Sequence, residues 1–291
     1  GKLDNNQSVL AISLENPNPE IFQLLLEAGA EFRPDMVDEK GNTFLHLILT
    51  RHNSSSETIE FLLQKGADVN ARNEKGNTVL WSAARIVKNP EIIRLLLKAR
   101  AELNAKGIYG DTPLMEAALN QSPEFLSALL VAGADINMQN NYGETALMRA
   151  VANPNPNFTK LLLEAGADVN MKDNLTQSSA LLRACGYAPV ETIQLLLDAG
   201  ADPGIRNVLN QSAYDQALHN PNLAGTELLE TLKKLSPPPL PERKPDLKDF
   251  DYVEPYTPPP PREPSDFDSM DWAVRWAAYG KVISLIIGIL C

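Results

Sequence analysis

The sequence of 291 residues has little cysteine, little histidine and a deficit of positive charge. Its two cysteines, Cys185 and Cys291, lie far apart, so we predict no disulfide framework and expect a reducing, cytoplasmic compartment. The three histidines, His46, His52 and His219, do not have the spacing of metal ligands. With 26 basic and 37 acidic residues the net charge is −11, which argues against nucleic acid as the main partner, because a phosphate backbone requires a basic stripe.

Motifs of catalysis and targeting are missing too. The sequence has no phosphate-binding glycine loop, no Gly-rich dinucleotide turn and no nucleophile elbow. It also lacks an N-terminal basic segment followed by an apolar run, so no secretory signal is expected. We therefore predict a protein without enzymatic activity and without a cofactor.

The sequence does contain an internal repeat. The three-residue pattern Gly66-Ala67-Asp68 returns in exact or varied form along the chain, each time after a leucine-rich run. Its copies begin at Gly29, Gly66, Arg100, Gly133, Gly166 and Gly200, with spacings of 37, 34, 33, 33 and 34 residues. A second pattern keeps the same period, as in Asn77-Thr78-Val79-Leu80-Trp81 and Asp111-Thr112-Pro113-Leu114-Met115. A fixed period of this length indicates a stack of similar structural units.

Each unit has the features of two short helices. Thr or Ser is expected to cap the first helix, and Pro113 fits a first helical position because its missing N–H leaves no bond unmade. Asn-Pro or Ser-Pro steps, such as Asn89-Pro90, predict the start of the second helix. A glycine then ends that helix, because glycine readily takes the left-handed conformation. Arg100 replaces this glycine once, so we expect that helix end to be looser or longer.

These motifs resemble the ankyrin repeat. Residues 38–46 nearly complete the family pattern D-x-x-G-x-T-P-L-H, and residues 62–70 match its second half, L-L-x-x-G-A-D-V-N. The resemblance implies an all-α ankyrin-repeat solenoid, a helix-turn-helix stack with short hairpin fingers, over residues 1–235. The expected repeats span residues 4–37, 38–72, 73–105, 106–139, 140–172, 173–206 and 207–235, the last of them a capping repeat.

The resemblance also implies that the fingers and the first helices line a concave surface that binds protein partners. Along the chain the expected finger tips change from charged, as in Glu39 and Lys40, to apolar. Exposed apolar residues mark interaction surfaces, so we predict a partner site on the later fingers and the groove beside them. The predicted site comprises Ile108, Tyr109, Tyr142, Leu175 and Leu209 on the fingers and Trp81, Met115 and Met148 in the groove. Two alternatives stay open: the tips pack on one another, and the groove residues pack in the core between repeats.

The composition changes abruptly after the repeats. Residues 236–264 form a proline-rich segment, with eleven prolines between Pro237 and Pro264, and an extended polyproline II linker is predicted. Within it, Pro238, Pro241 and Arg243 fit the P-x-x-P-x-R pattern of SH3 ligands. Such matches are common by chance in proline-rich segments, so a spacer is the favoured interpretation.

Residues 265–291 predict a C-terminal helix with an aromatic face and an apolar end. Aromatic residues beside an apolar run are typical of a membrane interface, so we expect a membrane anchor or a docking helix over residues 270–291. Its expected contact residues are Trp272, Trp276, Tyr279, Lys281, Ile283, Ile286 and Ile287. A single membrane span is doubtful because Lys281 would lie near its middle, and packing of the tail on protein remains the alternative.

Taken together, these features favour a non-catalytic scaffold or adaptor that binds a protein on its concave surface and is tethered by its C-terminal helix. Three other functions stay open. The chain could be a structural subunit of a multiprotein, membrane-embedded assembly, a bacterial effector acting on host proteins, or a scaffold whose groove is blocked by its own tail.

Overall fold

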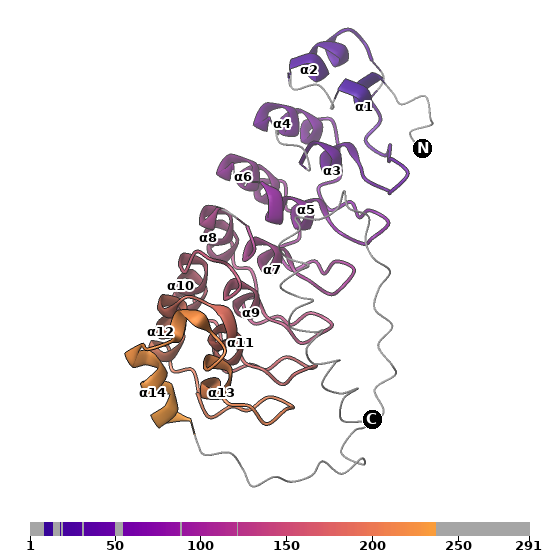
Figure 1. The fold of residues 1–291 in the computed structure, drawn as a ribbon. Coiled ribbons are helices and arrows are strands. Elements are labelled where there is room, and N and C mark those ends of the chain that lie inside the picture. The colour runs from indigo at the N-terminus through magenta and orange to yellow at the C-terminus, as the bar shows by residue number, and fades with distance from the viewer. Residues whose placement is uncertain are drawn as a thin grey trace, which may run out of the picture. The chain divides into compact units, whose positions relative to one another are not determined.

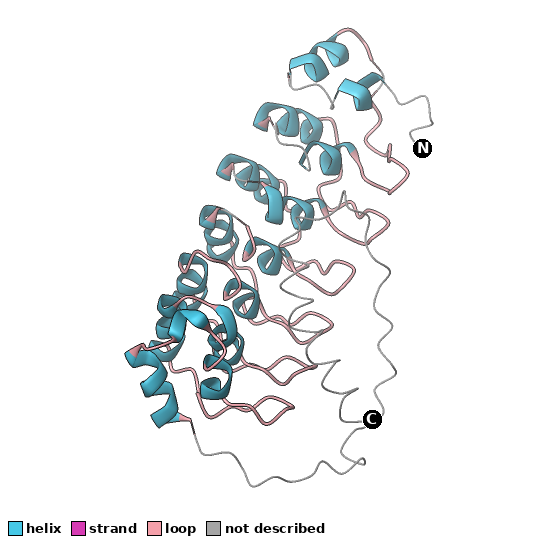
Figure 2. Cartoon of the chain, viewed as in Figure 1, coloured by secondary structure: helices cyan, strands magenta, loops and turns pink. Residues whose placement is uncertain are grey.

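The computed structural model describes residues 9–236, except for residues 14–17, 19, 31, 50–54, 88 and 121. In this part of the chain the regular structure is helical, and the β-type pairings are two isolated bridges, Val37 with Thr43 and Arg72 with Thr78. The helices alternate between two rows, and loops project from one side of the stack (Figures 1 and 2). The predicted all-α solenoid is confirmed for these residues.

The helices form an inner row and an outer row. The inner helices are α1 (Val9–Ser13), α3 (Phe44–Leu49), α5 (Val79–Ile86), α7 (Pro113–Ala117), α9 (Ala146–Ala150), α11 (Ala180–Tyr187) and α13 (Ala213–Ala217). The outer helices are α2 (Glu20–Glu27), α4 (Ser56–Gln64), α6 (Pro90–Lys98), α8 (Pro123–Val131), α10 (Asn157–Glu164), α12 (Val190–Asp198) and α14 (Glu227–Leu235), with a 3-10 helix η1 (Pro221–Leu223) before α14. From α3 to α13 each inner helix contacts the next inner helix, and from α4 to α12 each outer helix contacts the next outer helix.

A single apolar core runs through the stack between the two rows. Small residues at one repeated position let neighbouring inner helices approach closely, and all of them are buried: Ala83, Ala117, Ala150, Ala184 and Ala217. The leucines of the outer helices fill the space behind them, as Leu62, Leu96, Leu129, Leu162 and Leu196 do at equivalent positions. Since no pair of short helices could bury such a face alone, stability comes from the contacts between pairs.

Caps fix where the inner helices begin. The side chain of Thr112 accepts a hydrogen bond from the backbone N–H of Met115, and Pro113 is the first residue of α7. The same cap is made by Thr78, Thr145, Ser179 and Ser212 for α5, α9, α11 and α13. The capping inferred from the sequence therefore holds at each of these helices.

The Asn-Pro and Ser-Pro steps are less uniform than predicted. Asn89-Pro90 starts α6 as expected, with Asn89 as the cap. Pro156, by contrast, is the cap residue of α10, which begins one residue later than predicted, and Asn220-Pro221 starts η1 and not the outer helix. Helix α14 begins later, capped by Thr226, because the final outer helix is displaced by the short η1 turn.

The expectation for Arg100 was wrong. Helix α6 has nine residues, as α4, α8 and α12 do, and its end is closed by the same two bonds, from the N–H of Arg100 to Leu97 O and from that of Ala101 to Leu96 O. Arg100 has a φ of 65°, close to the left-handed conformation of Gly66 and Gly133. The neighbouring repeats impose the turn, so the arginine takes a strained backbone conformation in place of a longer helix.

Candidate functional site

The fingers are hairpin loops that precede the inner helices, and five of the described fingers are shaped by an Asx turn. The fingers are numbered by the repeat that each begins. In the fifth finger, at the start of repeat 140–172, the side-chain oxygen of Asn140 accepts hydrogen bonds from the N–H groups of Tyr142 and Glu144, at 2.9 Å each. Asp38, Asn73, Asp173 and Asn207 make equivalent bonds in other fingers. This local bonding holds the tip residues in a defined position without burying them.

Backbone hydrogen bonds join neighbouring fingers into a row. The N–H of Asn141 donates to Tyr109 O at 3.0 Å, and that of Asn174 donates to Tyr142 O at 2.8 Å. Similar bonds run from Glu74 to Lys40 and from Val208 to Thr176. The tips therefore form a continuous, pre-formed ridge along the stack and not a set of separate loops.

The fourth finger, residues 106–112, departs from this pattern. Gly107 occupies the Asx position, and the N–H of Ile108 donates to the side-chain oxygen of Asn77. A Cβ at position 107 would lie 2.5 Å from Asn77 Oδ1 and 2.9 Å from Trp81 Nε1. Gly107 is therefore required for the finger to pack over the Trp81 indole, which is partly buried.

The predicted tip residues differ in exposure. Ile108 and Leu175 are exposed, at 49 % and 43 %, and so is Val208 at 55 %. Tyr109 and Tyr142 are half-buried and pack on each other, with ring centroids 6.2 Å apart. Leu209 is half-buried as well, whereas the earlier tips present the exposed charged residues at 39–40 and 74–75. The row thus changes from charged to apolar along the stack.

The predicted groove residues lie deeper. Met115 and Met148 are 1 % and 2 % exposed and belong to the core between repeats, which is the core-packing alternative. His46, at the equivalent position of α3, is also fully buried. The residue at this position faces the next repeat, and it is buried or partly buried in each of these helices.

The position directly after this groove residue carries a buried network of ionic contacts that sequence reasoning missed. Arg149 of α9 is 4 % exposed in its side chain and lies 2.5 Å from Asp111, 2.7 Å from Glu116 and 3.5 Å from Glu144. Arg183 of α11 extends it, at 2.8 Å from Glu144 and 3.1 Å from Asp173. Burial alone would lower the pKa of Arg149, but the three carboxylates hold that pKa above its ordinary value. The guanidinium therefore stays charged inside the protein.

A signal for this network is present in the sequence. Glu116, Arg149 and Arg183 occupy the same repeat position, directly after the groove residue. Opposite charges at equivalent positions of stacked units face each other once the units are in register. Their contacts between repeats join residues 33 to 39 apart in the chain, so only the stacking shows that they are buried and paired.

The thiol of Cys185 is fully buried, and burial raises its pKa to about 12, so it stays protonated at neutral pH. Among these residues no three His, Cys, Asp or Glu side chains are grouped so as to hold a metal ion. None of the helices between residues 9 and 236 is long and apolar enough to cross a membrane.

The predicted linker and tail residues lie outside the described part of the chain. This applies to Pro238, Pro241 and Arg243 of the proline-rich segment. It applies equally to the predicted docking residues Trp272, Trp276, Tyr279, Lys281, Ile283, Ile286 and Ile287.

The row of Asx-turn fingers over capped inner helices can be compared with known proteins. A sequence profile described as "Ankyrin repeats (3 copies)" matches residues 8–107, 46–140 and 114–207. The chain belongs to the ankyrin-repeat family. No curated protein sequence matches it.

Two solved ankyrin domains illustrate the likeness. The ankyrin repeat domain of Bcl-3, a member of the IkappaB protein family, is 26 % identical with a TM-score of 0.60, over 77 % of this chain and 97 % of that one. The human ASB11 ankyrin repeat domain is 24 % identical with a TM-score of 0.67, over 80 % of this chain and 100 % of that one, and shows likeness of fold alone. Ankyrin-repeat domains are in general non-catalytic modules that bind other proteins.

Proposed function

We propose that this ankyrin-repeat protein is a non-catalytic scaffold whose partner protein binds on the fingers from the fourth to the seventh. The observation that carries the proposal is the exposure of Ile108, Leu175 and Val208 at finger tips, in the same row as the packed pair Tyr109 and Tyr142. An apolar side chain at a tip has no core to fill, whereas burial against a partner would stabilise a complex.

The ionic network of Arg149 and Arg183 stabilises the bases of these fingers. Arg149 and Arg183 bind carboxylates at the bases of the fingers, through Asp111, Glu144 and Asp173. A finger held by such contacts loses little freedom on binding, which favours affinity because less conformational entropy is lost. The partner would therefore meet a rigid apolar ridge.

A triple variant tests the proposal. Ile108→Ser, Leu175→Ser and Val208→Ser together remove the apolar tips and leave the core unchanged, so the chain should fold. The amount of protein that co-purifies with the full chain from cells should fall at least about tenfold, because hot-spot residues each contribute on the order of 2 kcal/mol. The matched control replaces exposed tips of the charged fingers, Glu39→Ser and Lys40→Ser, and should retain the partner. Equal recovery with both variants would contradict a site on the later fingers.

The tether is a separate part of the proposal. The apolar tail over residues 265–291 would hold the scaffold at a membrane or in a larger complex, with the proline-rich segment as a spacer of about 90 Å if fully extended. The sequence of the tail, with its aromatic residues beside an apolar run, supports this tether.

A further inference from the structure

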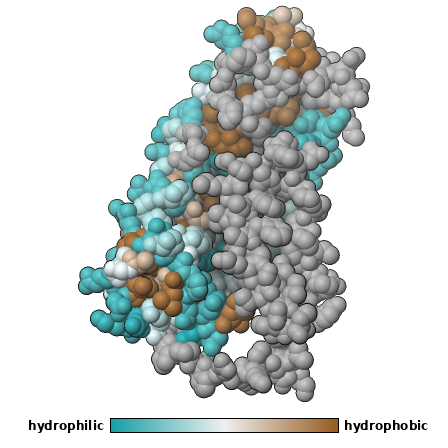
Figure 3. Space-filling view, viewed as in Figure 1, coloured by the Kyte–Doolittle hydropathy of each residue, from teal (hydrophilic) through white to brown (hydrophobic). Residues whose placement is uncertain are grey.

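The outer helices present a repeated pattern of polar side chains to solvent, and α8 breaks it. At the last outward position, α4, α6, α10 and α12 carry Gln64, Lys98, Glu164 and Asp198. Helix α8 carries Val131 there, and its side chain is 87 % exposed, the highest value among the exposed large apolar residues of the described chain. On the face shown in Figure 3, the middle of the row of outer helices is mostly hydrophilic.

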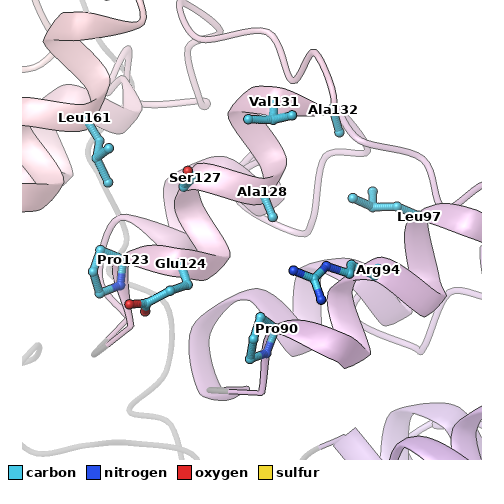
Figure 4. Close-up of a pocket in the computed structure, with 10 residues that line it drawn as sticks. All are labelled: Pro90, Arg94, Leu97, Pro123, Glu124, Ser127, Ala128, Val131, Ala132 and Leu161. Atoms are coloured by element: carbon cyan, nitrogen blue, oxygen red, sulfur yellow. The ribbon is translucent and has the colours of Figure 1, made fainter.

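Two further positions of α8 are also unlike their equivalents. Ala128 stands where the other helices have Phe61, Leu95, Leu161 and Leu195, and Ser127 stands where they have longer polar residues. A depression of about 620 Å³ lies at these smaller side chains, lined by residues of α6 and α8 and by Leu161 of α10. Its walls include Leu97 and Arg94 of α6, and Arg94 projects toward α8 (Figure 4). One repeat in the middle of the stack thus has both a hollow and an exposed apolar residue.

Helix α6 brings an excess of positive charge to one side of the hollow. Helix α6 has two cationic residues, Arg94 and Lys98, against Glu91, and Arg100 follows directly after its end. None of the other outer helices of the described chain has more cationic than acidic residues within its bounds. Arg94 pairs with Glu91 at 3.1 Å, but both side chains are more than half exposed, so this pair is weak and can be exchanged. In a chain of net charge −11, this local excess of positive charge is complementary to an acidic group.

The position of the charges sets an orientation. Glu124 lines the hollow at the beginning of α8, whereas Lys98 and Arg100 lie at the end of α6, on the side of Val131. The hydroxyl of Ser122 donates to the Glu124 carboxylate, which lowers the pKa of that carboxyl and keeps it charged. An acidic group of a partner is therefore favoured at the Val131 end and disfavoured at the Glu124 end.

We infer that the groove between α6 and α8 is a second docking site, which takes a segment of a partner protein with one bulky apolar side chain next to acidic residues. The apolar side chain occupies the space over Ala128 and Val131, and the acidic residues pair with Arg94 and Lys98. This site lies on the outer helices and is independent of the finger row, so the scaffold would bind two different segments at the same time.

A peptide array tests the specificity of the groove. The probes are twelve-residue peptides with a central Leu, Phe or Gln, flanked on either side by Glu, Gln or Lys, and the fluorescently labelled full chain is applied to them. We expect retention on peptides with a central Leu or Phe and flanking Glu. The double variant Arg94→Glu with Lys98→Glu should reverse the preference to flanking Lys.

Two substitutions fill or charge the hollow with residues that the neighbouring repeats already use. Ala128→Leu copies α6, α10 and α12, and Val131→Glu copies α10, so both should fold. Each should weaken binding of the selected peptide about tenfold or more, or about 1.4 kcal/mol. The matched control, Gln194→Ala on α12, and the finger variant with Ile108, Leu175 and Val208 replaced by Ser should both bind as the wild type does.

Several results would overturn the inference. Equal binding to peptides with a central Gln would leave charge alone as the determinant, and unchanged binding by the Ala128→Leu chain would place the peptide elsewhere. Absence of any selected peptide would remove the site. Binding of the chain to phosphatidylserine vesicles that is lost in the Arg94→Glu, Lys98→Glu variant, without peptide selectivity, would show a lipid surface as the ligand.

Discussion

At the scale of single residues, Arg149 shows how the stack accommodates a buried charge. Its guanidinium forms ion pairs with Asp111 and Glu116 of the preceding repeat, and it lies 3.5 Å from Glu144 of its own repeat. A buried ion pair is not a strong source of stability compared with apolar packing, but a carboxylate cluster left without its cation is costly. The network therefore links adjacent repeats in one register.

We expect Arg149→Met to lower the free energy of unfolding by about 3–5 kcal/mol, because Asp111 and Glu116 would lose the buried cation that pairs with them, while Glu144 would keep its ion pair with Arg183. Chemical denaturation measures this change. The control, Arg94→Met, breaks an exposed ion pair on α6 and should change stability by less than about 0.5 kcal/mol. Similar small effects for both variants would show that the network is solvated.

His46 makes the stability of the first described repeats depend on pH. Its Nε2 is 3.1 Å from the carbonyl oxygen of Asn77, which can only accept, so Nε2 carries the hydrogen. Nδ1 then accepts from the N–H of Thr43 at 3.3 Å. Burial lowers the pKa of this imidazole, while the bond to Asn77 and the charge of Asp38 act in the opposite direction. The folded protein therefore holds His46 neutral.

Because the folded pKa of His46 is lowered, the unfolded chain binds a proton more readily, and stability falls as the pH drops below the ordinary histidine value. Between pH 6.5 and 5.5 the free energy of unfolding should decrease by up to about 1 kcal/mol from this group. The variant His46→Gln should lose this part of the slope. Denaturant titrations at both pH values compare the two chains, and parallel slopes would exclude His46 as the cause.

At the scale of elements, the outer helices end in the same left-handed turn whether or not glycine is present. Arg100 has a φ of 65° where Gly133, Gly166 and Gly200 have 89°, 89° and 83°. A Cβ at Gly166 or Gly200 would meet nothing within 4 Å, so the cost of a side chain there is the backbone strain itself. At Arg100 the packing of the repeats around α6 offsets this backbone strain.

Replacing Arg100 by Gly should raise the free energy of unfolding by about 1 kcal/mol, because the left-handed conformation costs an L-residue about that much. The reciprocal variant Gly166→Arg should lower it by a similar amount. Thermal unfolding of both chains checks the pair. A destabilised Arg100→Gly chain would mean that the arginine side chain makes a favourable contact that offsets the strain.

At the scale of the whole molecule, the apolar surface is distributed unevenly. On the face seen in Figure 3, apolar residues gather near α1 and α2 at one end of the stack and near α13 and α14 at the other. Val9, Ile12 and Leu24 are exposed at the first end, and Leu218 and Leu235 at the second. A partner that covers an end as well as the fingers would bury more apolar area than the fingers offer alone.

Deletion of residues 265–291 separates the functions that the sequence left open. An adaptor should lose its place in the cell, a structural subunit should leave its complex, and a scaffold blocked by its own tail should bind more partner. We expect the shortened chain to lose its location in the cell, because the deleted residues include the aromatic and apolar run. Fractionation of cells and recovery of the partner, for the full chain and the shortened chain side by side, distinguish the three outcomes. An unchanged distribution in both assays would contradict a tether.

The sequence determined the architecture because its signals are local and repeated. Thr112 caps a helix through a residue three positions away, and Gly133 ends one through bonds within a single turn, so each signal can be interpreted without knowing the rest of the fold. The same caps and helix ends recur in register in successive repeats, which excludes a chance match to the motif. The family and the finger positions followed from the same motifs.

Only the tertiary structure decided which of the predicted side chains face a neighbouring repeat and which face solvent. Met148 and Ile108 are both apolar residues at positions that the motif predicts to face a partner, yet one is buried and the other is half exposed. The pairing of Arg149 with Asp111 and the hollow at Ala128 likewise depend on residues that are distant in sequence. Burial in a solenoid is a property of two stacked units, so the sequence of one unit cannot specify it alone.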